Sequence, residues 1–477
     1  MINDLAGFIK EVDGIGECKL VEKADWNIEI GSISEVFLAM PNPPMLLFDS
    51  IKDYPKGYRV VTGAFATPRR VLLALDPENT EQDLVSYFRR RLKEGIKPIP
   101  PVQVENGYIK ENIQVGSSVD VFRFPAPKWH SLDGGRYIGT GSVVITRDPE
   151  EGWVNFGTFR VQIHNRDTAT VYISPGKQTD IIRRKYWAKG KPCPAVVVCG
   201  EEPVLYYVAA LQFPWGDSEY DMAGWLKNKP IEVIKGVTTD IPIPASAEIA
   251  LEGEIMPPDV ERIEEGPFGE WTGYYASGAK LEPTFKIKAI LHRNHPIILG
   301  TPPLMNFGSA YAVTLAQRLA ILWNELDNVV PGIVGVGALE GARGLYMPVI
   351  SIKQMYPGHA KHAGMAAASS RILAYHYGRF IIVVDEDIDP TNTSEVLWAM
   401  ATRCDPLDSI DVARGCWSSA LDPTLSPFKK SQGDLTNNKA IINACKPYHW
   451  KDKYPVSFKL NFDEVKKVRD KWRHLFK

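Results

Sequence analysis

The sequence predicts a mixed α/β (α+β) protein in which a strand-rich middle lies between two segments that mix helices and strands. Its 477 residues are more than a single hydrophobic core usually organises. Residues 121–305 carry mostly β-branched or alternating sequence, whereas residues 1–120 and 306–477 alternate helical and strand periodicities. A core of strands with few helices is typical of a barrel or a sandwich. We therefore expect three domains with these bounds and a β-barrel in the middle one.

The N-terminal segment reads as a small α/β unit. A short helix over Asp4–Val12 ends at Asp13-Gly14, and strands are expected at Met45–Phe48 and Tyr58–Gly63. Thr80–Asp83 resembles a capping box and precedes apolar residues at helical spacing. The Pro-rich stretch at residues 97–101 follows as a stiff connector.

The middle segment contains six expected strands and two short helices. The helices are placed at Thr179–Lys189 and Tyr220–Leu226. The strands are expected at Gly141–Asp148, Phe159–Ile163, Thr170–Ser174, Ala195–Cys199, Ala247–Ile255 and Thr284–His292. A planar cofactor would fit well at the mouth of such a barrel.

The C-terminal segment alternates again, with helices at Ala310–Val329 and Gly364–Tyr377 and strands at Leu345–Ile352 and Arg379–Asp385. The unbroken apolar run in the last of these strands predicts burial on both faces in a parallel sheet. A final helix carries one apolar stripe, which suits either an oligomer contact or packing on its own domain. The stripe consists of Val465, Val468, Trp472 and Leu475.

Composition excludes several classes of protein. Apolar residues make up 44% and charged residues 23% of the chain, and the net charge of −2 does not indicate a nucleic-acid or anionic-membrane partner. The N-terminal segment lacks the pattern of a signal peptide, and no apolar stretch is long enough for a membrane span. The six cysteines are scattered without a C-x-x-C motif, which argues against zinc and structural disulfides. We expect a cytoplasmic protein.

Two carboxylates bracket a Gly-Pro-Phe-Gly turn in the stretch Glu264–Tyr275. Glu265 and Glu270 are five residues apart, and the glycines and the proline favour a rigid loop. The loop can turn both acids toward one cavity with aromatic walls. Apolar walls favour the neutral form of a carboxylic acid, which is the form that donates a proton. A pair of acids at this spacing, without other evidence, more often belongs to a solvated turn on the protein surface.

A second group of residues offers side-chain oxygens. Asn155, Gln178 and Glu219 contain no thiol or imidazole, so they would suit a hard cation such as Mn²⁺ or Mg²⁺ shared with a phosphate. Lys177 would add a positive charge for the same phosphate. Arg160 faces the other way from Asn155 on a regular strand, although a bend could redirect it. Taken singly, these residues are more often turn residues or helix-terminal acids.

Over essentially its whole length the chain resembles the UbiD-type decarboxylases, which use prenylated FMN. The matching segments occur in the family's order and together are specific. They are Ile2-Asn3-Asp4-Leu5, Asn155–Arg160, Ser174-Pro175-Gly176-Lys177, Ser218-Glu219-Tyr220, Pro244–Glu248, Leu251-Glu252-Gly253, Glu265–Glu270, Tyr356–Lys361 and Val384–Asp389.

The resemblance implies a central split β-barrel that binds the flavin, and it assigns roles to individual residues. Arg160, Glu265 and Glu270 match the family's catalytic Glu–Arg–acid network, with Glu270 as proton donor. The metal ligands matched are Asn155 and Glu219, which tie the flavin phosphate to Mn²⁺ beside a monovalent cation, expected to be K⁺. The cofactor contacts implied are Asn155, Phe156, Gly157, Thr158, Phe159, Arg160, Lys177, Gln178, Glu219 and Lys361.

The chain departs from the family at one ligand. Gln178 stands where the family usually places a histidine, and an amide oxygen can still bind Mn²⁺ or Mg²⁺, with less selectivity for transition metals. If the register shifts by one residue, Lys177 occupies this position and would serve the phosphate. We expect Gln178 to be the third ligand.

The implied reaction is the reversible, non-oxidative decarboxylation of an aromatic, heteroaromatic or α,β-unsaturated acid through a covalent adduct with prenylated FMN. The partners would be that acid, CO₂, a flavin prenyltransferase that supplies the cofactor, and further copies of the chain in a dimer or hexamer. Two alternatives stay open: an oxidoreductase that uses ordinary FMN, and a non-catalytic subunit of an aryl carboxylase complex. Retention of all three residues of the Glu–Arg–acid network argues against the second alternative.

Overall fold

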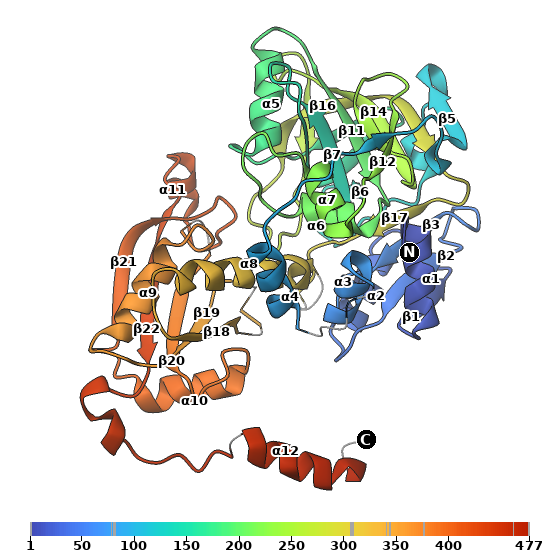
Figure 1. The fold of residues 1–477 in the computed structure, drawn as a ribbon. Helices are drawn as coiled ribbons and strands as arrows, with labels where there is room; N and C mark the ends of the chain where they lie inside the picture. The colour runs from blue at the N-terminus through green and yellow to red at the C-terminus, as the bar shows by residue number, and fades with distance from the viewer. Residues whose placement is uncertain are drawn as a thin grey trace.

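The computed structural model describes residues 2–77, 79, 83–305, 310–339, 341–342, 345–374, 377–460 and 462–475. Within these residues the strands form four sheets, of four, ten, three and five strands. The ten-stranded sheet dominates one lobe of the molecule and the five-stranded sheet the other (Figure 1). No helix in this part of the chain has the length and apolar character that crossing a membrane requires.

The N-terminal sheet has the order β1-β2-β3-β17, in which the last strand comes from a distant part of the sequence. α1 begins after Asp4, whose Oδ1 accepts a hydrogen bond from the Gly7 amide at 2.7 Å. The strands and helices predicted here are confirmed, whereas Thr80, Glu81 and Gln82 of the expected capping box lie outside the described residues. The elements are α1 (Leu5–Gly14), β1 (Cys18–Glu22), α2 (Glu29–Leu38), β2 (Met45–Asp49), β3 (Arg59–Thr62), α3 (Pro68–Leu75), α4 (Leu84–Lys93) and β17 (Ile297–Gly300).

The middle of the chain forms a half-barrel with the strand order β6-β9-β10-β16-β14-β11-β7-β8, and β5 and β15 both pair with β16. Alternate residues of its inner strands enter two different cores: on β11, Val196 and Val198 face one and Val197 the other. The strands are β5 (Asn112–Val115), β6 (Arg136–Gly139), β7 (Ser142–Arg147), β8 (Val154–Gly157), β9 (Val161–Asn165), β10 (Thr168–Val171), β11 (Cys193–Cys199), β14 (Ile249–Ile255), β15 (Arg262–Glu265) and β16 (Lys280–His292).

Strand pairing attaches residues before the expected boundary at 120 to this middle part. β5 pairs with β16, and β4 pairs with β12 in the three-stranded sheet. A division near residue 101, after the Pro-rich connector, therefore agrees better with the pairing than one at residue 120. The remaining elements are β4 (Val102–Gln103), α5 (Gln178–Trp187), α6 (Pro203–Ala209), α7 (Glu219–Lys227), β12 (Glu232–Lys235) and β13 (Pro242–Pro244).

The C-terminal lobe is a five-stranded sheet of order β18-β19-β20-β22-β21. β20 runs parallel to both of its neighbours, and its residues after Phe380 are all buried, which confirms the predicted double burial. The elements are α8 (Ala310–Asp327), β18 (Ile333–Ala338), β19 (Pro348–Ile352), α9 (His359–Ser369), β20 (Phe380–Asp385), α10 (Thr393–Arg403), β21 (Ile410–Trp417), α11 (Pro427–Ser431), β22 (Thr436–Ala444) and α12 (Phe462–Lys471).

The helix predicted over Gly364–Tyr377 has the wrong bounds. α9 starts earlier, after Gly358 in the left-handed conformation, and stops where Ser370 becomes extended. Beyond that point the carbonyls of Leu373 and Tyr377 accept hydrogen bonds from the buried Lys439 ammonium. A lysine from a distant strand thus satisfies backbone groups that the periodicity had assigned to a longer helix.

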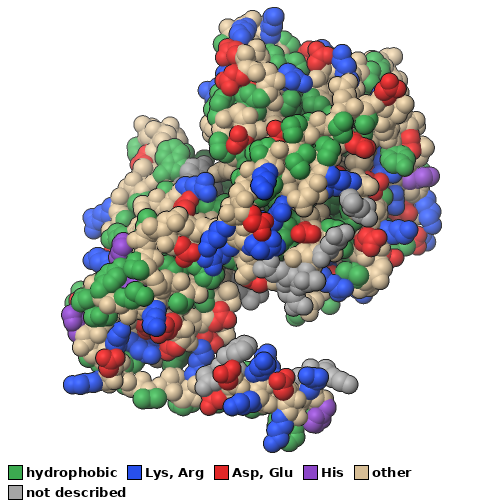
Figure 2. Space-filling model, viewed as in Figure 1, with side chains coloured by type: hydrophobic (Ala, Val, Ile, Leu, Met, Phe, Trp, Pro, Cys, Tyr) green, Lys and Arg blue, Asp and Glu red, His purple; other side chains and the backbone are tan. Residues whose placement is uncertain are grey.

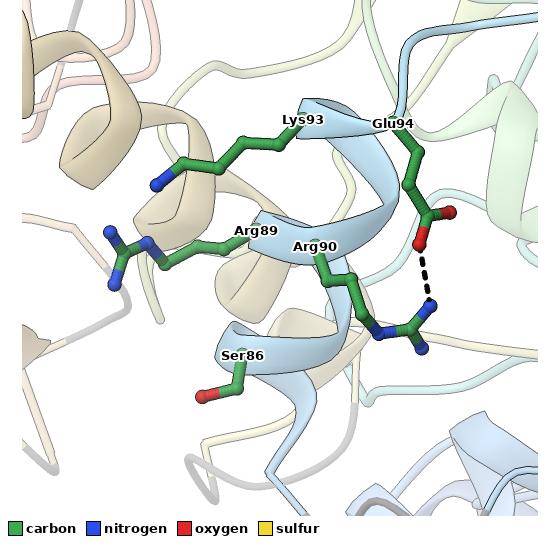
Figure 3. A pocket seen from close by; sticks show the side chains of 5 residues that line it. All are labelled: Ser86, Arg89, Arg90, Lys93 and Glu94. Atoms are coloured by element: carbon green, nitrogen blue, oxygen red, sulfur yellow. Dashed lines mark hydrogen bonds and ion pairs between the residues drawn. The ribbon is translucent and has the colours of Figure 1, made fainter.

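Helix α4 of the N-terminal part lies against α8. The Arg89 guanidinium donates to Asn324 at 3.2 Å and to Asp327 at 2.6 Å, and it stacks 3.8 Å above the Trp323 ring. Figure 3 shows Arg89 and Lys93 extending to one side of α4, while Arg90 on another face pairs with Glu94 at 3.0 Å. These contacts hold α8 in place, and α8 contributes directly to the site described below.

The last helix does not pack on its own domain. α12 follows an extended segment and lies apart from the C-terminal sheet (Figures 1 and 2). Its apolar stripe is exposed, with Val468 47%, Trp472 43% and Leu475 67% accessible. Of the two expectations for this helix, packing within its own domain is therefore not observed.

Candidate active site

The two acids of the Gly-Pro-Phe-Gly loop meet on one arginine. Arg160 donates from Nε to Glu265 Oε1 at 2.8 Å and from Nη2 to Glu265 Oε2 at 2.9 Å, which is a bidentate ion pair. Its third nitrogen, Nη1, donates to Glu270 Oε1. β8 ends at Gly157 and residues 158–160 are irregular, so the backbone bend that Arg160 needs in order to face the loop is present.

Burial sets the protonation of this cluster. Desolvation raises the pKa of Glu270, the charge of Arg160 opposes this effect, and the nearby Glu265 carboxylate adds to it. For Arg160, burial alone would lower the pKa, but the hydrogen bond and charges of the two acids raise it above its ordinary value. The guanidinium therefore stays charged, and Glu270 is the group that holds a proton more readily than an ordinary glutamate.

Aromatic rings and a buried amide support the cluster from behind. The Arg160 guanidinium lies 3.9 Å from the ring centre of Tyr172 and 5.2 Å from that of Phe268. The Tyr137 hydroxyl lies 3.3 Å from Glu265 Oε1, and burial together with the charge of Glu265 raises the Tyr137 pKa, so the phenol stays neutral. Gln162 Oε1 accepts from the Gly266 amide at 2.9 Å, which anchors the start of the loop.

A cavity of about 290 Å³ opens in front of Arg160 and Glu270. Glu265 does not line it, so the two acids differ in access to a ligand. The wall combines the half-barrel with α8 and the C-terminal lobe. The lining residues are Thr140, Thr158, Phe159, Arg160, Tyr172, Ser174, Tyr206, Ala210, Phe268, Glu270, Trp271, Thr301, Pro303, Thr314, Arg318, Tyr377 and Leu421.

The three oxygen-bearing residues also converge. The Asn155 amide nitrogen donates to Gln178 Oε1 and to Glu219 Oε1, each at 2.9 Å, and the Glu219 carboxylate accepts from the Phe156 amide at 2.8 Å. Burial raises the pKa of Glu219 to about 8. The Asn155 Oδ1 accepts from Thr179 Oγ1 at 2.8 Å, and a half-turn of the Asn155 amide would instead point three oxygens at one spot. That donor set fits a hard cation, although its single carboxylate makes it a weakly charged site.

The other predicted cofactor residues lie in different places. Thr158 and Phe159 line the cavity, whereas Phe156 is buried against Tyr220 with ring centres 4.9 Å apart. Lys177 directly precedes α5, and its side chain is exposed at the surface. Desolvation by the protein atoms around its ammonium group, together with the positive charge of Arg318, lowers its pKa. Lys361 is not brought to this site: it pairs with Asp411 at 2.7 Å and lines a separate cavity in the C-terminal lobe.

Three family models match consecutive parts of the chain. They describe the N-terminal domain (residues 11–87), the Rift-related domain (residues 101–305) and the C-terminal domain (residues 311–444) of 3-octaprenyl-4-hydroxybenzoate carboxy-lyase, UbiD. The chain belongs to the UbiD family. It is therefore a carboxy-lyase by family, and the resemblance inferred from the sequence motifs is confirmed.

Named relatives in the UbiD family decarboxylate aromatic acids. The chain is 31% identical over 442 residues to the pyrrole-2-carboxylic acid decarboxylase of Pseudomonas aeruginosa, covering 89% of this chain and 87% of the relative. It is 32% identical over 422 residues to the phenolic acid decarboxylase of Sedimentibacter hydroxybenzoicus, covering 85% of this chain and 83% of the relative.

Solved UbiD-class structures share the whole fold. The vanillic acid decarboxylase of Sedimentibacter hydroxybenzoicus in its open form has a TM-score of 0.85 at 27% identity and covers 100% of both chains. HmfF from Pelotomaculum thermopropionicum in complex with FMN has a TM-score of 0.85 at 27% identity, over 98% of this chain and 99% of that one. The predicted fold class, a mixed α/β protein, is confirmed, and its middle part contains a half-barrel.

Sequence reasoning missed several residues that shape the site. Tyr137 and Gln162 hold the loop from strands whose sequence carries no distinctive motif, so nothing in it pointed to them. Arg318 and Tyr377 reach the cavity from the C-terminal lobe. For Arg318 the sequence contained a signal, because it is the only charged residue between Ala310 and Trp323, a mostly apolar stretch.

Proposed function

We propose that the chain catalyses the reversible, non-oxidative decarboxylation of an aromatic, heteroaromatic or α,β-unsaturated carboxylic acid with prenylated FMN as cofactor. The observation that carries the proposal is the position of Glu270: a buried acid with a raised pKa that faces a cavity and is held by Arg160. Breaking the bond to CO₂ leaves a carbon that must gain a proton, and an acid whose pKa is raised holds a proton that it can donate.

The residues of the acid–arginine cluster have distinct roles in the reaction. Prenylated FMN, when bound, supplies an acceptor for the electron pair released with CO₂. Glu270 gives its proton to the carbon that lost CO₂, while Arg160 orients the Glu270 carboxyl through its Nη1 hydrogen bond. Glu265 keeps Arg160 in place through two hydrogen bonds. In the carboxylation direction Glu270 takes the proton back.

Asn155, Gln178 and Glu219 are the residues that we assign to Mn²⁺ or Mg²⁺, with K⁺ as a second cation beside it. The position of Gln178 Oε1 and Glu219 Oε1, each 2.9 Å from the Asn155 amide nitrogen, supports this assignment. The cation would bind the flavin phosphate, and Lys177 would add a further positive charge to that end of the site. Phe156, Gly157, Thr158 and Phe159 would contact the flavin, and Lys361 stays a prediction from the resemblance alone.

The proposal is tested by anaerobic purification from cells that also produce a flavin prenyltransferase, followed by absorbance and mass analysis of the cofactor. Prenylated FMN with about one Mn²⁺ or Mg²⁺ per chain is the expected result. A screen for CO₂ exchange with aromatic acids would then identify the substrate. Plain FMN that NAD(P)H bleaches would instead indicate an oxidoreductase, and a protein without any flavin would contradict the proposal.

We also propose that α12 joins copies of the chain in a homo-oligomer. Its exposed apolar stripe, together with Val456 at 96% and Phe458 at 101% accessibility in the segment before it, has no cover within the described chain. The dimeric state of an evolved form of HmfF supports the proposal that copies of the chain associate. A cytoplasmic location stays a prediction from the sequence.

A further inference from the structure

The loop that carries Glu265 and Glu270 rests on a second loop from a distant part of the chain. Residues 130–135 form an irregular turn just before β6, and this turn lies against residues 266–269. The Gly134 amide donates to the Pro267 carbonyl at 2.8 Å, and the Gly269 amide donates to Asp133 Oδ1 at 3.1 Å. The two loops are thus joined at two points.

The backbones of the two loops touch where they cross. A Cβ atom on Gly134 would lie 1.9 Å from the Gly266 carbonyl oxygen, and a Cβ atom on Gly269 would lie 3.1 Å from the His130 ring. The first of these distances excludes any residue other than glycine in this backbone arrangement. Direct backbone contact therefore sets the position of one loop relative to the other.

Asp133 supplies the side chain that joins the two loops. Its carboxylate is fully buried, and its oxygens accept from the Gly269 amide and, at 2.9 Å, from the His130 amide of its own turn. Burying a carboxylate costs free energy unless hydrogen bonds compensate for the lost water, and both of these bonds do so. Asp133 does not line the cavity, so its role there is not contact with a ligand.

The bond to the Gly269 amide matters because Glu270 is the next residue. On its other side Glu270 is fixed by a tight turn, in which its amide donates to the Tyr274 carbonyl at 3.0 Å. That turn belongs to the same loop and would move with it, whereas the bond to Asp133 ties the loop to the segment before β6. Losing this bond would let Glu270 shift relative to the cavity.

We propose, building on the function proposed above, that Asp133 is a positioning residue, which holds Glu270 at the distance and direction that proton transfer to the substrate carbon requires. A displacement of about 1 Å between reacting groups can lower a rate by roughly 10²-fold, so a modest movement of the loop is enough to matter. Asp133 acts through Glu270 and takes no part in binding the substrate or the flavin.

The test is a double-mutant cycle of Asp133→Ala and Glu270→Gln in the flavin-loaded protein. We expect Asp133→Ala alone to lower kcat by about 10–100-fold while KM changes by less than about threefold. In the Glu270→Gln background the same change should have no further effect on kcat, because the proton donor that Asp133 positions is already absent. Asp120→Ala is the control and should keep the parent kcat, since Asp120 also accepts from a backbone amide, that of Phe122 at 3.1 Å, but does not line the cavity.

Hydrogen–deuterium exchange reports on the loop without relying on turnover. The peptide that contains residues 266–275 should exchange faster in Asp133→Ala than in the parent, because the Gly269 amide loses its acceptor. Asp133→Asn retains one side-chain oxygen, which can accept from one of the two amides. It should show an intermediate loss of kcat, and it replaces the alanine variant if that variant does not fold.

Three results would overturn the inference. They are a kcat for Asp133→Ala within about threefold of the parent, an equal loss of kcat in the Glu270→Gln background, and unchanged exchange in residues 266–275. Loss of bound flavin from Asp133→Ala would also contradict it, because Asp133 would then act in cofactor binding. If the parent decarboxylated no acid while the exchange still depended on Asp133, the decarboxylase would be contradicted and the anchoring of Glu270 by Asp133 would stand.

Discussion

Replacing Glu270 with glutamine separates proton donation from cofactor binding. The amide has the size of the acid, and Arg160 keeps both of its hydrogen bonds to Glu265, so the change removes one charged contact of the cluster. A hydrogen bond between charged groups contributes on the order of 1–3 kcal/mol, which the large fold can absorb. The variant should therefore fold and bind flavin as the parent does.

The effect on turnover should be far larger than the effect on folding. An amide cannot give up a proton at neutral pH, and losing a positioned general acid typically lowers kcat by about 10²–10⁴-fold, or roughly 3–5 kcal/mol of barrier height. The assay is CO₂ release under anaerobic conditions with flavin content determined for each sample. Glu264→Gln is the matched control, because Glu264 is the exposed neighbour of the same loop.

Two outcomes would refute this reasoning. If flavin-loaded Glu270→Gln kept more than about a tenth of the parent kcat, Glu270 would not be the proton donor. If the variant lost its flavin while Glu264→Gln kept it, the acid would act in binding. Uptake of deuterium from solvent into the product offers a second readout, since the parent should incorporate it at the carbon that carried CO₂.

Three further predictions follow from charge and exposure. Because burial raises the pKa of Glu270, decarboxylation should persist above the ordinary range of a glutamate, fall as pH rises through the raised pKa, and lose this limb in Glu270→Gln. Glu201 is fully buried, and desolvation raises its pKa well above the usual value, so the folded protein holds this proton more tightly than the unfolded chain does. Between the ordinary glutamate pKa and the raised pKa of the folded protein, the free energy of unfolding of the parent relative to Glu201→Gln should therefore drop by about 1.4 kcal/mol per pH unit, measured by denaturant titration; a pH-independent difference would contradict the raised pKa. Trp472→Glu should lower the mass found by light scattering and Lys467→Glu on the same helix should not, and an unchanged mass in both would exclude α12 from the oligomer contact.

Much of the fold was predictable because its periodicities are strong. The apolar run before Asp385 predicted a strand buried between parallel neighbours, and β20 has those neighbours. The helix expected over Gly364–Tyr377 has the wrong bounds, because α9 ends at Ser369, and the Tyr377 carbonyl beyond it accepts from Lys439, 62 residues further along the chain. Local sequence reports helical propensity, and it does not reveal contacts with a distant strand.

The candidate site was predictable only in part, because several of its residues come from distant parts of the chain. Glu265 and Glu270 share one loop, and their spacing around a rigid turn is visible in the sequence. Arg160 could be paired with them only through the family resemblance, since a regular strand would have pointed it away. Arg318 comes from a different lobe, and its place in the cavity wall depends on how α8 is placed against the half-barrel, which no local pattern encodes.

The arrangement of hydrogen-bond donors explains why two similar acids take different roles. Each N–H donated to a carboxylate stabilises its ionised form. Glu265 receives two from Arg160, lies 3.3 Å from the Tyr137 hydroxyl and does not line the cavity. Glu270 receives one from Arg160, and it faces the cavity. Glu270 is therefore the acid whose raised pKa and access to the cavity suit proton donation, while Glu265 holds Arg160 in place. Glu270 thus serves as the proton donor and Glu265 as the residue that holds Arg160. Exchanging these two roles would require Arg160 to move.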